Sequence, residues 1–226
     1  MVILAVDTTS RSGSLALARG GEVLESIAIE APDGFGQILY PWIETLLSHR
    51  KLAIPDIGLY AAASGPGSFT GIRVGMTAIK ALAEVNGKQV VAVSNLLAMA
   101  EAGQGRLRAP VLDARREQVY AAVYDSELRP VVDECVVAWP EFLRLTGGHE
   151  VTFVAQSAGL FEAGGAAPLP KKETGNRHVI LTEPLAAAVA RVAAHAHRRG
   201  EAVPPEAIDA NYVRRSDAEL KWRDPR

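Results

Sequence analysis

The chain has 226 residues, of which 48% are hydrophobic and 22% are charged, and its formal net charge is −2. Such a composition is typical of one large globular domain or two smaller lobes with a sizeable core. The near-neutral charge excludes a global basic field that would attract nucleic acid or anionic membranes. The single cysteine, Cys135, excludes an internal disulfide and cannot build a zinc site alone. We therefore expect a cytoplasmic protein, and no apolar stretch is long enough to predict a membrane span.

Short apolar runs alternate with helical patterns through the first half of the chain. We expect strands at residues 2–6, 13–18, 22–29, 57–63 and 90–93. Helical spacing predicts helices at residues 38–47, 71–86 and 96–102. Pro41 lies inside the first helical pattern, so that helix should start late or kink there. The glycine-containing segment GQGRLRAP predicts a boundary between a first lobe, residues 1–103, and a second, degenerate lobe, residues 104–226, whose C-terminal segment could pack back on the first lobe.

The second half of the chain repeats the pattern with which the first half begins. In both halves an apolar strand leads to an aspartate, Asp7 or Asp113, and then to a polar turn and another strand. This similarity suggests two lobes of related topology, although chance also produces it, because apolar strands that end in aspartate are common. Further strands are expected at 119–124, 131–137 and 151–155, and helices at 140–145 and 184–199, before a charged tail.

The segment SGPGSFTGIRVG, residues 64–75, resembles a phosphate-binding loop in composition. A Walker A loop needs a lysine directly after its last glycine, but Ile72 follows Gly71. A dinucleotide fingerprint needs a third glycine where Thr70 stands. Two interpretations remain: a helix N-terminus that holds an anion through backbone N–H groups, or glycines that make a tight turn and allow close packing.

The helix expected at residues 71–86 is apolar over an arc about twice as wide as one sheet face requires. One apolar stripe contains Ile72, Met76, Ile79 and Ala83, and the next contains Val74, Ala78, Ala81 and Val85. One stripe should pack on a sheet, and the other needs a second cover. That cover is either the chain's own helix at 38–47 or another subunit.

Other residues give little support for catalysis. Asp7, with Thr8, Thr9 and Ser10, could hold a phosphate or a hydrated magnesium ion, or could simply form a hydrogen-bonded turn. No histidine pair has the spacing that binds a metal from one helix face, and no serine lies in a nucleophile elbow. The sequence therefore predicts no catalytic residues and no metal site.

Several segments together resemble the bacterial TsaB proteins, also called YeaZ. They are ILAVDTTSRSGSLAL (3–17), SGPGSFTGIRVGMTAIKALA (64–83), VSNLLAMA (93–100), LDARREQVYAAVY (112–124) and NYVRR (211–215). The resemblance implies an α/β, actin-like, two-lobed fold of the sugar kinase and acetate kinase type. It also implies a non-catalytic partner subunit that supports TsaD in installing threonylcarbamoyl on the adenosine next to the anticodon of tRNAs.

The same resemblance implies particular partners. They are a TsaD-like catalytic subunit, a TsaE-like ATPase and, for the chain alone, a second copy; tRNA is contacted only indirectly or weakly. TsaD carries an H-x-x-x-H metal motif, and here Asn95 and Met99 stand at its two histidine positions. No metal, cofactor or peptidase activity is therefore expected. The alternative is an actin-like ATP-dependent phosphotransferase or ATPase that uses Asp7 and Thr8.

Two sets of site residues follow from the resemblance. The family's association surface corresponds to helices at about 36–48 and 71–86, and its expected residues here are Leu39, Trp42, Leu46, Ile72, Arg73, Met76, Ala78, Ile79 and Ala81. A vestigial nucleotide cleft would contain Asp7, Thr8, Thr9, Gly65 and Gly67. On this interpretation the loop is rich in glycine in order to turn the chain and to start an interface helix tightly against the lobe.

Overall fold

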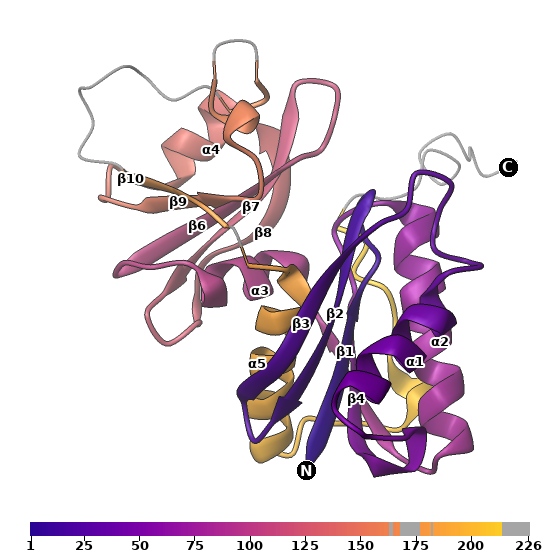
Figure 1. Cartoon of the computed structure of the whole chain (residues 1–226). Helices are drawn as coiled ribbons and strands as arrows, with labels where there is room; N and C mark the ends of the chain where they lie inside the picture. Colours follow the sequence, from indigo (N-terminus) through magenta and orange to yellow (C-terminus); the bar gives the residue numbers. More distant parts are fainter. Residues whose placement is uncertain (163–164, 168–176, 182, 214–226) are drawn as a thin grey trace, which may run out of the picture.

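The computed structural model describes residues 1–162, 165–167, 177–181 and 183–213, and it contains two lobes that are each built on a five-stranded sheet (Figure 1). The first sheet has the strand order β3-β2-β1-β4-β5, with β1 (Val2–Asp7), β2 (Ser12–Arg19), β3 (Glu22–Glu30), β4 (Ile57–Ala63) and β5 (Gln89–Val93). The second has the order β10-β9-β6-β7-β8, with β6 (Leu107–Asp113), β7 (Gln118–Asp125), β8 (Pro130–Ala138), β9 (Thr152–Ala155) and β10 (Arg177–Ile180).

Both sheets have the same topology. In each sheet the first three strands form an antiparallel meander, the first strand pairs in parallel with the fourth, and the fourth pairs in parallel with the fifth. Asp7 and Asp113 are the last residues of the equivalent strands β1 and β6. The suggested duplication and the predicted two-lobed α/β class are therefore confirmed. The sequence did not predict β10, because its four residues contain an apolar run of only two.

Strand β1 lies at the centre of the first sheet and is buried on both faces. Alternate residues of a strand point to opposite faces, and here Ile3 and Ala5 join one core while Leu4 and Val6 join another. All four side chains are fully buried. The uniformly apolar sequence of this strand thus reflects helices on both sides of the sheet.

Each sheet is covered by helices, and two of these helices come from the other half of the chain. α1 (Leu39–His49) and α2 (Phe69–Val85) lie on one face of the first sheet, and α5 (Leu185–Arg198) lies on the other (Figure 1). α3 (Asn95–Ala102) follows the first sheet but packs on β6 and β7, and α4 (Trp139–Leu145) packs in the second lobe. α3 lies before residue 103 but packs on the second sheet, and α5 lies after it but packs on the first sheet. The division of the chain at residue 103 therefore remains a proposal. None of the described helices has the length and apolar character needed to span a membrane.

Helix α1 accommodates Pro41 without a break. The helix begins at Leu39, so Pro41 is its third residue. In the first turn of a helix the N–H groups have no intrahelical partner, and the missing N–H of proline costs nothing there. The expected late start or kink is therefore wrong, because the helix begins two residues before the proline and continues through it.

Candidate functional site

The nine residues expected to form a partner interface fall into two groups. Six of them have side chains at most 5% exposed and belong to the core of the first lobe: Leu39, Leu46, Ile72, Met76, Ala78 and Ile79. Their side chains pack within their own lobe, and their place in a partner interface stays a prediction. Trp42, Arg73 and Ala81 are exposed and stay in the proposed interface.

The wide apolar arc of α2 has its second cover within the chain itself. The core that contains α1 and α2 also contains Ile208, and the short helical turn Pro205–Ala207 lies against α2. The C-terminal segment therefore packs on α2, in the same core that α1 joins. Sequence periodicity could not reveal this cover, because the segment around Ile208 is irregular and has no repeating pattern.

The solvent-exposed side of α1 and α2 is the candidate docking face. We define it by the exposed residues Trp42, Phe69, Arg73, Thr77, Ala81 and Val85. Both helices lie on the same side of the first sheet (Figure 1). Arg73, Thr77 and Ala81 recur every four residues and so form one stripe along α2. Val85, at 89% exposure, ends the helix as a fully open apolar side chain. The face thus combines aromatic anchors with small residues that allow close approach.

The glycines of the loop before α2 are required by its contact with the turn after β1. A Cβ at Gly71 would lie 1.9 Å from the Thr8 carbonyl oxygen, and one at Gly67 would lie 2.6 Å from the Thr9 carbonyl oxygen. The Thr8 hydroxyl donates a hydrogen bond to the Gly71 carbonyl over 2.7 Å. Protein backbone therefore occupies the space beside both glycines. The glycines permit close packing, as the second interpretation of this loop predicts.

A buried polar network lies between this turn and α3. Asp7 Oδ1 accepts hydrogen bonds from the Thr9 backbone N–H at 2.9 Å and from the Thr9 hydroxyl at 2.6 Å. Asn95 Nδ2 donates to Thr9 Oγ1 at 2.6 Å, and Asn95 Oδ1 accepts from the Gly65 N–H at 3.1 Å. Burial raises the pKa of the Asp7 carboxyl, while the two hydrogen bonds from Thr9 act in the opposite direction. The network ties the first lobe's two loops to the start of α3.

Replacing Asp7 by Asn is expected to leave the chain at least as stable as wild type near neutral pH, since Asn retains an acceptor for Thr9. The raised pKa of Asp7 means that the folded state binds a proton more readily than the unfolded state. Wild type therefore loses stability as pH rises from the ordinary carboxyl range through the raised pKa. Urea unfolding at about pH 5 and about pH 8 should show a larger advantage for Asp7→Asn at the higher pH. A larger advantage at the lower pH would contradict this.

Replacing Asn95 by Ala is expected to lower the free energy of unfolding by about 2 kcal/mol, because the buried Gly65 N–H loses its acceptor. Gln104→Ala, at an exposed position just after α3, is the control and should change stability by less than about 0.5 kcal/mol. Urea unfolding measures both values. Equal effects of the two substitutions would show that the Asn95 hydrogen bonds contribute nothing to stability.

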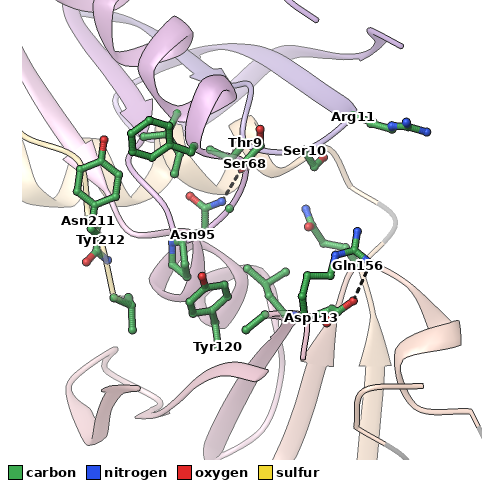
Figure 2. A pocket seen from close by; sticks show the side chains of 18 of the residues that line it. Thr9, Ser10, Arg11, Ser68, Asn95, Asp113, Tyr120, Gln156, Asn211 and Tyr212 are labelled. Carbon is green, nitrogen blue, oxygen red and sulfur yellow. Dashed lines mark hydrogen bonds and ion pairs between the residues drawn. The ribbon is translucent and has the colours of Figure 1, made fainter. Parts of the chain in front are cut away.

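An interlobe cleft of about 660 Å³ adjoins the network (Figure 2). Its volume is within the range of small-molecule sites. It is lined by residues 9–11, 66–69, 112–116 and 211–213, among others. Of the five residues expected in a vestigial nucleotide cleft, Thr9 and Gly67 line it. Asp7, Thr8 and Gly65 do not line it and are buried, which corrects their expected place.

The second lobe contributes a turn of unusual backbone conformation to the cleft. Arg115, Arg116 and Glu117 have φ values of 62°, 55° and 59°, in the left-handed region that non-glycine residues rarely adopt. The Asp113 carboxylate accepts hydrogen bonds from the Arg115 N–H at 2.7 Å and from its guanidinium at 3.2 Å. In Figure 2, Asp113 lies across the cavity from Thr9 and Ser68. Among the described lining residues Asp113 is the only carboxylate, and neither histidine nor cysteine is present.

Asn95 and Met99, at which the resemblance implies that metal-binding histidines are missing, are both buried. Asn95 belongs to the polar network, and Met99 belongs to the core under α5. Within the residues that the structure describes, no group of three His, Cys, Asp or Glu side chains is arranged to hold a metal ion. The charged tail from residue 214 onward lies outside the described residues.

Comparisons with known proteins agree with this architecture. Residues 29–213 match the family model described as TsaD, tRNA N6-adenosine threonylcarbamoyltransferase. The chain is 27% identical to the tRNA threonylcarbamoyladenosine biosynthesis protein TsaB of Bacillus subtilis over 98% of both chains. It is 33% identical to TsaB of Escherichia coli over 56% of each. Among solved structures, YeaZ from Pseudomonas aeruginosa is 26% identical with a TM-score of 0.75, over 93% of this chain and 99% of that one.

Proposed function

Since this chain belongs to the TsaB (YeaZ) group of the TsaD-type threonylcarbamoyltransferase family, we propose that it is the non-catalytic partner subunit of a TsaD-type enzyme. In this role it binds that enzyme and supports the transfer of threonylcarbamoyl to the adenosine next to the anticodon of tRNAs. Similarity to B. subtilis TsaB over 98% of both chains supports the role. The exposed docking face on α1 and α2 is the observation that carries the binding function.

We propose no catalytic role because the candidate acidic and hydroxyl groups already have hydrogen-bond or ion-pair partners within the chain. Asp7 is 2% exposed and bonds to Thr9, and the Thr8 hydroxyl is committed to Gly71. Asp113 faces the cleft but is paired with Arg115. A phosphotransferase needs a base that orients the attacking substrate hydroxyl, and a peptidase needs an activated nucleophile or a metal-bound water. The described cleft residues offer neither histidine nor an unpaired carboxylate for these tasks. The ATP-dependent alternative therefore has weak support.

Calorimetric titration of the free chain with ATP and Mg²⁺ distinguishes these alternatives. We expect no binding tighter than about 1 mM, an affinity that corresponds to about −4 kcal/mol. Thr8 and the loop glycines already contact each other, so phosphate oxygens would have to displace protein hydrogen bonds. Low-micromolar affinity would instead favour the actin-like ATPase or phosphotransferase.

Further partners belong to the same proposal. A TsaE-like ATPase would bind the assembled pair, and the free chain would form a homodimer through the docking face. tRNA would be contacted mainly by the TsaD-type subunit, because the net charge of −2 provides no general attraction for nucleic acid. The complex would work in the cytoplasm, where its tRNA substrate is found.

Co-purification with the TsaD-type protein of the same organism tests the proposed function. We expect the two proteins to elute together in size-exclusion chromatography, at a volume smaller than that of either protein alone. Separate elution at concentrations of tens of micromolar would contradict the proposal, because a physiological subunit contact should be tighter than that.

A further inference from the structure

Glu134 on β8 connects three parts of the molecule through one carboxylate. Its Oε1 accepts hydrogen bonds from the Ser94 hydroxyl and, at 2.8 Å, from the Tyr124 hydroxyl. Its Oε2 accepts a hydrogen bond from Asn211 Nδ2 at 2.6 Å. Ser94 is the N-cap of α3, Tyr124 belongs to β7, and Asn211 lies in the C-terminal segment. Glu134 therefore joins the second lobe both to the junction between the lobes and to the end of the described chain.

The C-terminal segment, residues 203–213, forms a strap across the first lobe. It begins with a two-way backbone pairing between Val203 and Val90 and buries Ile208 in the core beneath α1 and α2. The Asn211 N–H then donates to the Ser64 carbonyl at 2.8 Å. A Cβ at Gly65 would lie 2.8 Å from the Asn211 carbonyl oxygen. The strap thus lies directly on the glycine loop that starts α2.

The residue after Asn211 reaches the docking face. The Tyr212 ring lies 5.5 Å from the Phe69 ring, centroid to centroid, and the Tyr212 hydroxyl accepts a hydrogen bond from Arg73 Nε at 3.3 Å. The Arg73 guanidinium also lies 3.9 Å from the centroid of the Phe69 ring, within cation–π distance. Figure 2 shows Asn211 and Tyr212 together on the C-terminal segment beside the cavity. Tyr212 therefore restrains two exposed residues of the docking face.

The described hydrogen-bond partners of Glu134 are two hydroxyls and one side-chain amide, and all three donate to its carboxylate. Burial raises the pKa of the Tyr124 hydroxyl, and the charge and hydrogen bond of Glu134 raise it further, so Tyr124 remains a donor. Hydrogen bonds to a charged acceptor are stronger than those between neutral groups. Among the described residues that contact Glu134, Asn211 alone belongs to the strap.

We propose that Glu134 is a positioning residue: by holding Asn211 it seats the strap, and the seated strap fixes Arg73 and Phe69 in the orientation that a TsaD-type partner binds. The proposal rests on the proposed function for its binding half, whereas the seating of the strap is a property of the free chain. It assigns the second lobe a part in partner binding, although the docking face lies on the first lobe.

Glu134→Gln tests the contact with little change in shape. Its amide oxygen can still accept from Ser94 and Tyr124, but its NH₂ group then faces the NH₂ group of Asn211. A hydrogen bond re-forms only if the Asn211 amide turns over, and that bond lacks the charged acceptor of the wild-type contact. Adding Asn211→Asp to the Glu134→Gln chain exchanges the donor and the acceptor. The amide now at position 134 then donates to the carboxylate now at position 211. Asp133→Asn is the control, because it removes a charge at the exposed neighbouring position on β8.

Hydrogen exchange of the backbone N–H of Asn211, which bonds to the Ser64 carbonyl, measures in the free chain how firmly the strap is held. We expect Glu134→Gln to speed this exchange about tenfold, the double variant to restore it, and Asp133→Asn to leave it unchanged. Unchanged exchange in Glu134→Gln, or no rescue in the double variant, would overturn the role of Glu134 in the strap. Circular dichroism establishes that each variant is folded.

Partner affinity is then measured for the same four chains. The expected pattern is about tenfold weaker binding for Glu134→Gln and wild-type binding for the double variant and the control. Faster exchange with unaltered affinity would overturn the positioning role and leave the proposed function intact. Failure of the wild-type chain itself to bind would instead count against the proposed function. The exchange data would still test whether Glu134 holds the strap in place.

Discussion

Ala81→Arg is expected to weaken binding to a TsaD-type partner at least about 100-fold while the chain remains folded. Ala81 is exposed on the same stripe of α2 as Arg73 and Thr77. Its small side chain lets a partner helix approach to the usual 8–10 Å between axes, where a long side chain would be oversized. An unpaired charge buried in an interface costs several kcal/mol, and about 1.4 kcal/mol corresponds to tenfold in affinity. Calorimetry measures the affinity, and circular dichroism measures the fold.

Two further variants give this prediction its controls. Ala158→Arg places the same side chain at an exposed position in the second lobe and should bind like wild type. Met76→Glu places a charge at a side chain that is 5% exposed, and should unfold the first lobe instead of acting on binding alone. Wild-type affinity in a folded Ala81→Arg chain would show that the interface lies elsewhere.

Gly71→Ala is expected to lower the free energy of unfolding by about 3 kcal/mol or more. The added Cβ would lie 1.9 Å from the Thr8 carbonyl oxygen, and that atom belongs to backbone that cannot rotate away. Separating the two segments would also weaken the hydrogen bond from the Thr8 hydroxyl to the Gly71 carbonyl. In a chain of this length the loss corresponds to a fall in Tm of about 6–12 °C. Differential scanning calorimetry measures it.

Gly36→Ala is the matched control for Gly71→Ala. No heavy atom lies within 4 Å of a Cβ built at Gly36, and its φ is not in the left-handed region. The substitution should change Tm by no more than about 2 °C. A Gly71→Ala chain as stable as the Gly36→Ala chain would show that the glycine loop does not need its close contact with the turn after β1.

Much of the fold could be predicted from the sequence, because its elements have strong local patterns. The apolar run at 2–6 gave β1, and its repetition before Asp113 indicated the duplicated topology. Helix ends were placed within two or three residues, since Gly87 and Gly103 mark the ends of α2 and α3. The effect of Pro41 was misjudged, because it depends on which residue begins the helix, and apolar spacing alone does not fix that residue.

The site was predicted less completely, because periodicity tells which residues are apolar but not what covers them. Met76 and Ala78 fell on different apolar stripes of α2, yet both are buried, since the first sheet and the segment around Ile208 pack against the helix in the core that α1 also joins. Glu134 carried no sequence signal, and Tyr212 appeared only within the resembling segment NYVRR, with no role assigned to it. Tyr212 meets Arg73 because the strap runs back across the first lobe, and Glu134 meets Ser94 because β8 of the second lobe lies beside the start of α3. Such contacts between distant residues are invisible to local patterns.

Reconstituted threonylcarbamoylation of tRNA tests the central claim most directly. The TsaD-type protein of the same organism, the remaining components and the tRNA are incubated with and without this chain, and modified adenosine is quantified by mass spectrometry. A non-catalytic partner subunit predicts abundant product only when both proteins are present, none from this chain without the TsaD-type protein, and no rescue by the folded Ala81→Arg variant. Equal product with and without this chain, or product formed by this chain in the absence of the TsaD-type protein, would contradict it.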